Sequence, residues 1–161
     1  MKKTYSLTQS ALIAALYVVL TYLSSILGIA SGVIQVRISE ALTVLPAFTF
    51  SAVPGLFVGC FVANLLTGAA IWDVVFGSVA TLLGALGTYY LGTKKYLAPV
   101  FPIAANTAVI PFVLKIVYGV GEGYGFLFLT IFLGEFVSCG ILGVLLYSGV
   151  KKAKIFDRGN L

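Results

Sequence analysis

The segment LGTKKYLAPV (residues 91–100) places two adjacent lysines between two long apolar stretches. The other basic residues are also clustered, because eight of the ten Lys and Arg residues lie in three short groups. These groups are Lys2 and Lys3; Lys94 and Lys95; and Lys151, Lys152, Lys154 and Arg158. Cytoplasmic loops of membrane proteins carry such an excess of basic residues. We therefore expect all three groups on the cytoplasmic side, with an even number of membrane crossings between consecutive groups.

The composition is that of an integral membrane protein. Of the 161 residues, 60% are hydrophobic and 9% are charged, whereas soluble domains contain about 25% charged residues. We expect one transmembrane domain over residues 1–161. The net charge of +5 does not indicate nucleic acid as a partner, because the basic residues gather at the membrane edges. The first apolar stretch is too long for a signal-peptide core, so we expect a retained first span.

Apolar runs and their interruptions predict six spans. A helix needs about 20 residues to cross a hydrocarbon core about 30 Å thick. Pro46 predicts a kink inside a short second span, and Pro54-Gly55 predicts a turn before the third. The expected spans are Leu7–Ile29, Ile38–Val53, Pro54–Thr67, Trp72–Gly92, Leu97–Gly119 and Tyr124–Gly149.

A count of six agrees with the positions of the basic residues. With the amino terminus inside, the outward turns near 30–37, 68–72 and 119–125 contain one basic residue, Arg37. A count of five or seven would place one basic group outside. The sequence therefore predicts an all-α integral membrane protein, a six-transmembrane-helix bundle with both termini cytoplasmic.

Small residues recur at a spacing of four, which puts them on one face of a helix. Such ridges let helix backbones approach closely within a membrane. They indicate internal packing, or contact with a partner subunit where the ridge faces lipid. The ridges are Gly55, Gly59, Ala63 and Thr67; Ala80 and Gly84; and Ala11 and Ala15.

The usual catalytic constellations are missing from this sequence. It contains no histidine, which excludes the zinc-protease pattern and the common proton shuttle. It has no phosphate-binding G-x-x-x-x-G-K-[ST] loop, and the glycines at 121, 123 and 125 match no dinucleotide motif. Cys60 and Cys139 are isolated in apolar runs and are interpreted as small buried hydrophobes. We expect no enzyme activity, no metal and no cofactor.

Polar residues inside the spans are the candidate functional residues, because a charge at the bilayer centre costs roughly 2.5–3.5 kcal/mol. Counted from Tyr124 at about 1.5 Å per residue, Glu135 lies roughly 16 Å deep, near the midplane, and Asn106 lies at a similar level. Lys115 lies one turn from the outer end of its span. The outer half also contains Arg37, Glu40, Asn64, Trp72 and Asp73. This one-sided distribution predicts an outward-opening pocket for a ligand with several N–H donors or a positive charge.

Structural alternatives exist for several of these residues. Lys115 and Glu135 could form an ion pair, and Asp73 could cap the helix that it begins. Arg37 and Glu40 are three residues apart and could pair with each other. Trp72 could be an interfacial anchor.

An uptake protein needs a source of energy. This chain has no nucleotide-binding loop and no visible inverted repeat of the kind that secondary transporters use. Its small size and its expected pocket therefore favour a binding subunit that is driven by partner subunits.

Three segments carry a resemblance to a known family: IQVRISEALTVLP (34–46), PGLFVGCFVANLL (54–66) and WDVVFGS (72–78). With them the chain resembles the queuosine-precursor transporter family, whose members are substrate-binding subunits (S components) of bacterial energy-coupling factor (ECF) transporters. The resemblance implies a six-helix bundle in the bacterial plasma membrane, with a ligand bound near the outer face. It also implies a transmembrane coupling subunit and two cytoplasmic ATPase subunits as partners. Ala11 and Ala15 match the motif that faces the coupling subunit.

The resemblance implies a 7-deazaguanine substrate such as 7-aminomethyl-7-deazaguanine. Carboxylates can accept the N–H donors of its guanine-like edge and face its aminomethyl cation. We expect Glu40, Asp73 and Glu135 in these roles, Asn64 and Asn106 to orient the ligand, and Trp72 to stack on it. The alternatives are an S component for another cationic heterocycle such as thiamine, a self-sufficient transporter or channel that oligomerises through residues 55–67, and a membrane assembly factor.

Overall fold

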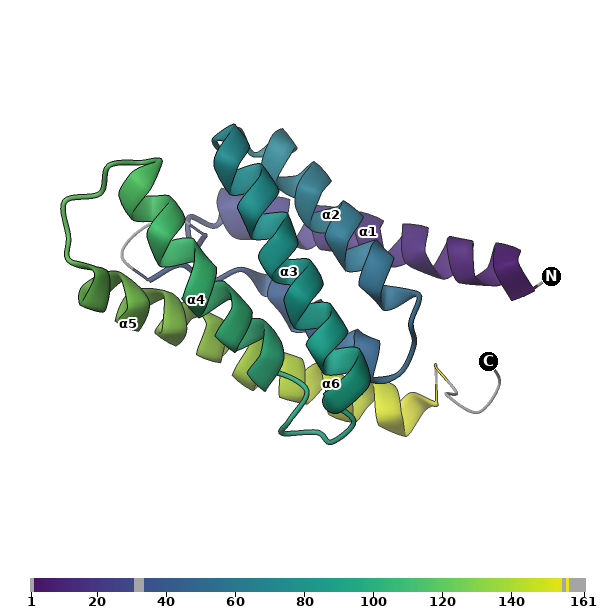
Figure 1. The fold of residues 1–161 in the computed structure, drawn as a ribbon. Helices are drawn as coiled ribbons and strands as arrows, with labels where there is room; N and C mark the ends of the chain where they lie inside the picture. Colours follow the sequence, from purple (N-terminus) through teal and green to yellow (C-terminus); the bar gives the residue numbers. More distant parts are fainter. Residues whose placement is uncertain (1, 31–33, 155, 157–161) are drawn as a thin grey trace.

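The fold is built from helices that run along one another in a bundle (Figure 1). The computed structural model describes residues 2–30, 34–154 and 156, and these residues contain no strand. The elements are α1 (Lys2–Ile26), η1 (Ile38–Ala47), α2 (Ala52–Leu66), α3 (Ile71–Leu91), α4 (Val100–Ile116), α5 (Tyr124–Glu135), η2 (Phe136–Leu142) and α6 (Gly143–Ala153).

Each predicted span contains a helical segment, and the all-α prediction is confirmed. The segments α5, η2 and α6 follow one another without a break and form one helix of 30 residues, Tyr124–Ala153. Three helices are long and apolar enough to cross a membrane: Lys3–Ile26, Ile71–Leu91 and Tyr124–Ala153. Between α5 and α6, η2 is a π-helical segment of 7 residues.

The second predicted span was wrong in its helix type and length. We expected a kinked α-helix over Ile38–Val53, but η1 is a 3₁₀ helix of 10 residues that ends at Ala47. At about 2 Å per residue it extends roughly 20 Å, less than the thickness of a hydrocarbon core. Pro46 lies inside this tighter helix. Every residue from Ser39 to Ala47 is buried, so the other helices surround η1.

The start of α1 and the end of α6 lie at the same end of the bundle as the connection between α3 and α4 (Figure 1). Side-chain contacts link these regions: Ser6 Oγ lies 2.7 Å from Ser51 Oγ, and the Phe48 and Tyr147 rings are 4.6 Å apart. The Tyr147 hydroxyl in turn donates a hydrogen bond to the Thr93 carbonyl oxygen at 2.7 Å.

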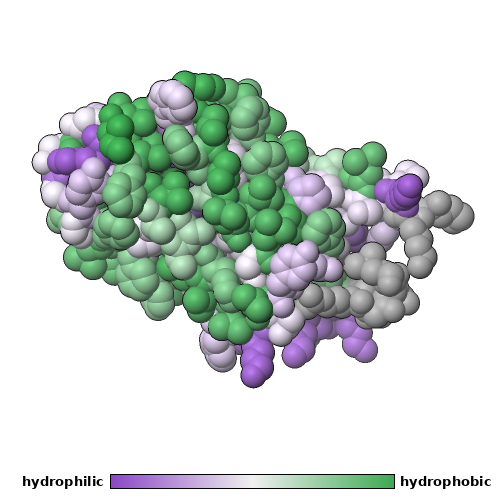
Figure 2. Space-filling model, viewed as in Figure 1, coloured by the Kyte–Doolittle hydropathy of each residue, from purple (hydrophilic) through white to green (hydrophobic). Residues whose placement is uncertain are grey.

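The basic groups that the structure describes therefore share one end of the molecule. Arg158, the last residue of the third group, lies outside the described residues. Figure 2 shows hydrophilic side chains gathered toward the ends of the bundle and apolar ones over the surface between them. This distribution suits a protein whose middle contacts lipid.

The small-residue ridge of α2 packs against α1. A Cβ atom on Gly55 would lie 2.7 Å from the Ser10 carbonyl oxygen, and one on Gly59 would lie 2.8 Å from the Tyr17 Cβ. In the same way, a Cβ on Gly84 would lie 2.7 Å from the Cα of Pro102, where α3 meets α4. Both ridges thus serve helix packing within the chain, which is the first of the two roles considered for such ridges.

Ala11 and Ala15 differ from these ridges. Both are exposed on α1, whereas Ile13 and Tyr17, each two residues further along, are buried against α2. Two residues correspond to about 200° around a helix, so the two alanines lie on the face of α1 that points away from the bundle.

The close approach of α1 and α2 leads to a test. Replacing Gly59 by Leu should lower the free energy of unfolding by about 1–3 kcal/mol, because the new side chain must displace Tyr17 or the backbone of Ala14. The thermal midpoint of the detergent-solubilised protein, followed by circular dichroism, measures the effect. Val58→Leu is the control, because Val58 is 48% exposed. Equal midpoints for the two variants would contradict this packing.

Candidate functional site

The extended segment that precedes η1 is fixed between α1 and the long carboxy-terminal helix. Its Ile38 amide donates to the Ser24 hydroxyl of α1 at 2.9 Å, and its Arg37 amide donates to the Ser138 hydroxyl of η2 at 3.1 Å. Gly134 allows this approach, because a Cβ there would collide with the carbonyl oxygen of Gln35. The polar segment therefore enters the bundle beside Glu135.

Two acidic side chains meet in the interior. Glu40 of η1 is 2% exposed, and one of its carboxyl oxygens accepts a short hydrogen bond from the Tyr17 hydroxyl. The Asn106 amide nitrogen, from α4, lies 3.5 Å from the other Glu40 oxygen and 3.0 Å from Glu135 Oε1. The Cys139 thiol donates to Glu135 Oε2 at 3.1 Å. We call Glu40, Asn106, Glu135 and Cys139 the carboxyl cluster.

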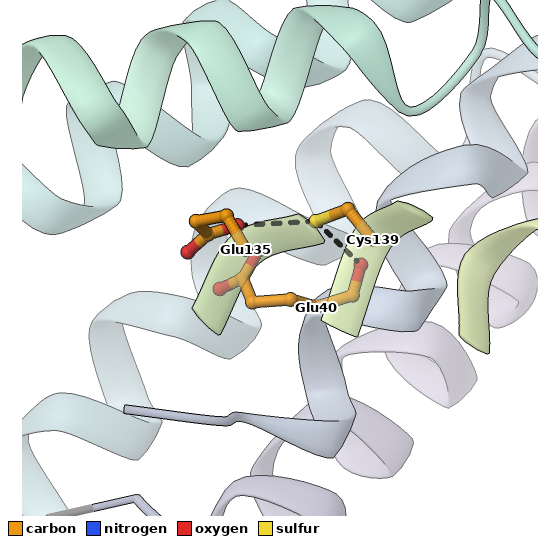
Figure 3. Close-up of side chains that lie close together, drawn as sticks. All are labelled: Glu40, Glu135 and Cys139. Atoms are coloured by element: carbon orange, nitrogen blue, oxygen red, sulfur yellow. Dashed lines mark hydrogen bonds between the residues drawn. The ribbon is translucent and has the colours of Figure 1, made fainter. Parts of the chain in front are cut away.

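Figure 3 shows the Glu40 and Glu135 carboxyl groups and the Cys139 sulfur directed toward one another. Potential ligand atoms of these three residues lie within 4.8 Å of one another. Each group already has a hydrogen-bond partner: Tyr17 and Asn106 donate to the carboxyl groups, and the thiol donates to Glu135 and to the Glu40 carbonyl oxygen. The geometry is that of a closed hydrogen-bond network, and it supplies no argument for a metal ion.

Arg37 lies beside the carboxyl cluster. Its guanidinium donates to Asn64 Oδ1 at 3.3 Å, and Asn64 is 1% exposed on α2. In the described part of the chain, Arg37 thus bonds to Asn64 and forms no ion pair with Glu40. A cavity of about 20 Å³ lies among these side chains. It is lined by Arg37, Glu40, Asn106 and Glu135, among others. That volume is enough for about one water molecule.

A larger cleft opens above this small cavity, with a volume of about 480 Å³. It lies between α1, α3, α4 and the connections at the end of the bundle that is remote from the chain termini. Arg37, Gln35 and Ile110 line both the cleft and the inner cavity, so they form the boundary between the two spaces. Asp73 and Tyr118 also line the cleft.

Asp73 is held by a neighbouring loop. The Tyr118 hydroxyl donates to Asp73 Oδ2 at 3.1 Å and accepts a hydrogen bond from the Ala70 amide at 3.0 Å. Asp73 lies in the first turn of α3 and is 8% exposed, but no side chain caps this helix by a hydrogen bond. Its carboxylate is therefore directed to Tyr118 at the edge of the cleft.

Two predicted site residues lie outside the site. Lys115 Nζ donates to the carbonyl oxygens of Gly121 at 3.2 Å and Glu122 at 2.8 Å, so it stabilises the connection between α4 and α5 and does not pair with Glu135. Trp72 is 57% exposed and stacks on Phe76, with ring centroids 6.1 Å apart. Neither residue lines the cleft or the inner cavity, so the geometry does not support ligand contact by either.

Sequence reasoning missed several members of the site. Tyr17, Tyr118 and Cys139 were taken as parts of apolar spans, and Gln35 as part of a turn. A tyrosine in the middle of a span is a usable signal, because a buried hydroxyl needs a hydrogen-bond partner. For Tyr17 that partner is Glu40.

The assembled site contains three carboxyl groups and one guanidinium, together with amide and hydroxyl groups. Such a set can bind a polar molecule that offers N–H donors or a positive charge. Of the predicted residues, the structure brings Arg37, Glu40, Asn64, Asp73, Asn106 and Glu135 to this region.

Comparison with known proteins gives the family of the chain. The family described as "QueT transporter" matches residues 7–152. A curated relative from Lactococcus lactis subsp. cremoris, named "Queuosine precursor transporter QueT", is 36% identical over 81 residues. The match covers 50% of this chain and 47% of the relative, so it spans about half the length of that protein. No solved structure matches the chain.

The amide that joins the two carboxyl groups leads to a second test. Asn106→Leu should lower the free energy of unfolding by about 1–3 kcal/mol, because it leaves buried carboxyl oxygens without their donor. Thr107→Val is the control next to it, since the Thr107 hydroxyl is buried without a hydrogen-bond partner. Thermal unfolding in detergent should separate the two variants by several degrees. Equal midpoints would show that the Asn106 amide contributes nothing.

Proposed function

The chain belongs to the QueT transporter family, and we propose that it is the substrate-binding S component of an ECF importer for a queuosine precursor. As a member of this family it is a multi-pass protein of the bacterial plasma membrane. The proposed substrate is a 7-deazaguanine such as 7-aminomethyl-7-deazaguanine, which is captured on the extracytoplasmic side.

The cleft carries this proposal. It lies at the end of the bundle opposite the basic groups, so the excess of positive charge on cytoplasmic loops supports a cleft that faces outward. In this orientation the six helical segments cross the membrane with both termini inside. The short η1 is compatible with a crossing, because it is buried among other helices and exposes no backbone to lipid.

The size of the cleft suits a bicyclic base. Its volume of about 480 Å³ falls in the range of about 300–1,000 Å³ that is usual for small-molecule sites. The inner cavity of about 20 Å³ is too small for such a ligand. We therefore place the base in the cleft, with Arg37 and Gln35 forming its floor.

The charges of the site favour a ligand with N–H donors and a positive group. Asp73 is the carboxylate that lines the open cleft, whereas Glu40 and Glu135 lie deeper, beyond Arg37. The Asp73 carboxylate at the open cleft attracts a cation. We assign Asp73 to direct contact with the ligand's aminomethyl group, and Glu40 and Glu135 to the hydrogen-bonded layer that holds Arg37 and Asn106 beneath the ligand. In this assignment the ligand cation takes the place of the Tyr118 hydroxyl at Asp73.

Transport needs partners, because this chain offers no nucleotide-binding loop. We propose the coupling subunit and the two ATPases of an ECF transporter, with Ala11 and Ala15 at the interface with the coupling subunit. The exposure of both alanines on the outer face of α1 supports this assignment. A self-sufficient channel that oligomerises through residues 55–67 loses its basis, since Gly55 and Gly59 pack against α1.

Binding of the precursor by the purified protein tests the assignment of Asp73. Asp73→Asn should weaken binding of 7-aminomethyl-7-deazaguanine about tenfold or more, because a hydrogen bond to a charged group contributes about 1.5–3 kcal/mol. The same substitution should weaken binding of the neutral 7-cyano analogue less. Isothermal titration calorimetry in detergent measures both affinities.

The control for that experiment is Glu122→Gln, which removes an exposed carboxylate outside the cleft. It should leave both affinities unchanged. Thiamine serves as the competing ligand: tighter binding of thiamine than of either deazaguanine would contradict the proposed substrate. An unchanged affinity in Asp73→Asn would contradict the assigned role of Asp73 alone.

The proposed interface with the coupling subunit is tested separately. Replacing Ala11 and Ala15 together by Trp should abolish co-purification with the coupling subunit and ATPases, because bulky side chains keep the helices apart. Precursor binding by the isolated subunit should persist. Val79→Trp, on an exposed position of α3, is the control and should leave the complex intact. Co-purification of the double variant at the wild-type level would exclude this face as the interface.

A further inference from the structure

A second large cavity lies on the surface of the bundle, away from the candidate site. It has a volume of about 800 Å³ and runs between α4 and the continuous helix of α5, η2 and α6. Its walls are almost entirely apolar: Val100 and Ile103 line one side, and Phe132, Phe136 and Leu145 line the other. We call it the α4–α6 groove. It shares no residue with the cleft or with the inner cavity.

The groove is long enough for a lipid acyl chain. Along α4 its lining extends from Pro99 to Ala108, and along the facing helix from Phe128 to Leu145. These stretches correspond to roughly 14 Å and roughly 26 Å of helix at about 1.5 Å per residue. One leaflet contributes about half of a hydrocarbon core about 30 Å thick. An acyl chain that enters at the basic end would therefore contact both walls through the depth of its leaflet.

The mouth of the groove is positively charged. Tyr96 lines the groove, and Lys95 Nζ lies 5.2 Å from the centroid of its ring. On the opposite wall, Val144 and Leu145 line the groove, and Lys151 and Lys152 follow each of them by seven residues, which is two turns along the same face of α6. A lysine of the α3–α4 connection and lysines of α6 therefore flank the same opening.

Acidic groups do not neutralise these lysines in the described part of the chain. Glu40, Glu135 and Asp73 belong to the candidate site, and Glu122 lies in the connection between α4 and α5. An apolar groove at least one leaflet long with cations at its mouth complements a molecule that has an acyl chain and an anionic headgroup. Basic pockets between transmembrane helices bind lipid headgroups in this way.

We propose that the α4–α6 groove binds one anionic phospholipid of the leaflet at the basic end, with an acyl chain between α4 and α6 and the phosphate at Lys95, Lys151 and Lys152. The apolar groove beside these lysines favours a lipid over free phosphate, because free phosphate has no acyl chain to fill it. This surface is remote from the cleft, so the proposed lipid site does not depend on the identity of the transported substrate.

Native mass spectrometry of the whole chain in mild detergent tests the proposal. The probes are phosphatidylglycerol and phosphatidylcholine with identical acyl chains. The protein should retain one phosphatidylglycerol molecule in preference to phosphatidylcholine. Replacing Lys95 and Lys152 together by Gln should reduce this preference about tenfold or more, because each lysine near a headgroup contributes about 1 kcal/mol. Ala104→Phe, which fills the groove, should reduce retention of both lipids.

The control variant replaces Lys2 and Lys3 by Gln, which removes the same charge at the same end of the bundle but outside the groove. It should keep the wild-type preference, and its thermal midpoint, like those of the other variants, should match the wild type. If Ala104→Phe fails to fold, Ala108→Phe replaces it on the same wall. Equal retention of the two lipids, or equal losses in the two lysine variants, would overturn the proposal.

Discussion

The amide of Asn106 holds the centre of this protein together. It donates to Glu40 of η1 and to Glu135 of α5, and thereby joins η1 to α4 and α5, which lie more than 50 residues further along the sequence. A carboxyl group buried without hydrogen bonds is costly, and the cost rises in a bilayer because water cannot replace the missing donor. The depth of η1 in the bundle depends on this contact together with the Tyr17 hydroxyl. The position of the segment that carries Arg37 depends on the same contacts, because this segment leads directly into η1.

This arrangement explains why the polar groups form two layers. In the inner layer, the hydrogen-bond donors and acceptors pair with one another around a cavity of about 20 Å³. The outer layer, with Asp73 and Tyr118, borders a cleft with room for a small molecule. Arg37 lies between the layers and lines both spaces, so it separates the closed inner network from the open cleft.

Hydropathy and the positions of Gly and Pro predicted most of the fold, because burial in lipid demands long apolar helices whose ends are marked by turn residues. The helix type of η1 could not be predicted, since an apolar run with one proline is compatible with several helix types. Depth was predicted better than direction: Glu135 and Asn106 were correctly expected at one level, and they meet. Trp72 and Lys115 were placed at a suitable depth, but Trp72 points outward and Lys115 bonds to loop carbonyls. The rotation of a side chain about its helix depends on packing between helices, and a single sequence does not contain that information.

The π-helical turn of η2 has a consequence for how this chain can change over evolutionary time. A wider turn accommodates one residue more than regular α-helix, and it directly follows Glu135 and contains Cys139. Loss of a single residue within this turn would convert it to ordinary α-helix and leave the flanking segments in nearly the same orientation. Loss of a residue between this turn and Tyr147 would instead rotate everything after it by about 100°. Tyr147 would then leave Thr93, and the closing lysines would face another side of the molecule. The wide turn is therefore where this helix can lose one residue while Glu135 and Tyr147 keep their relative orientation.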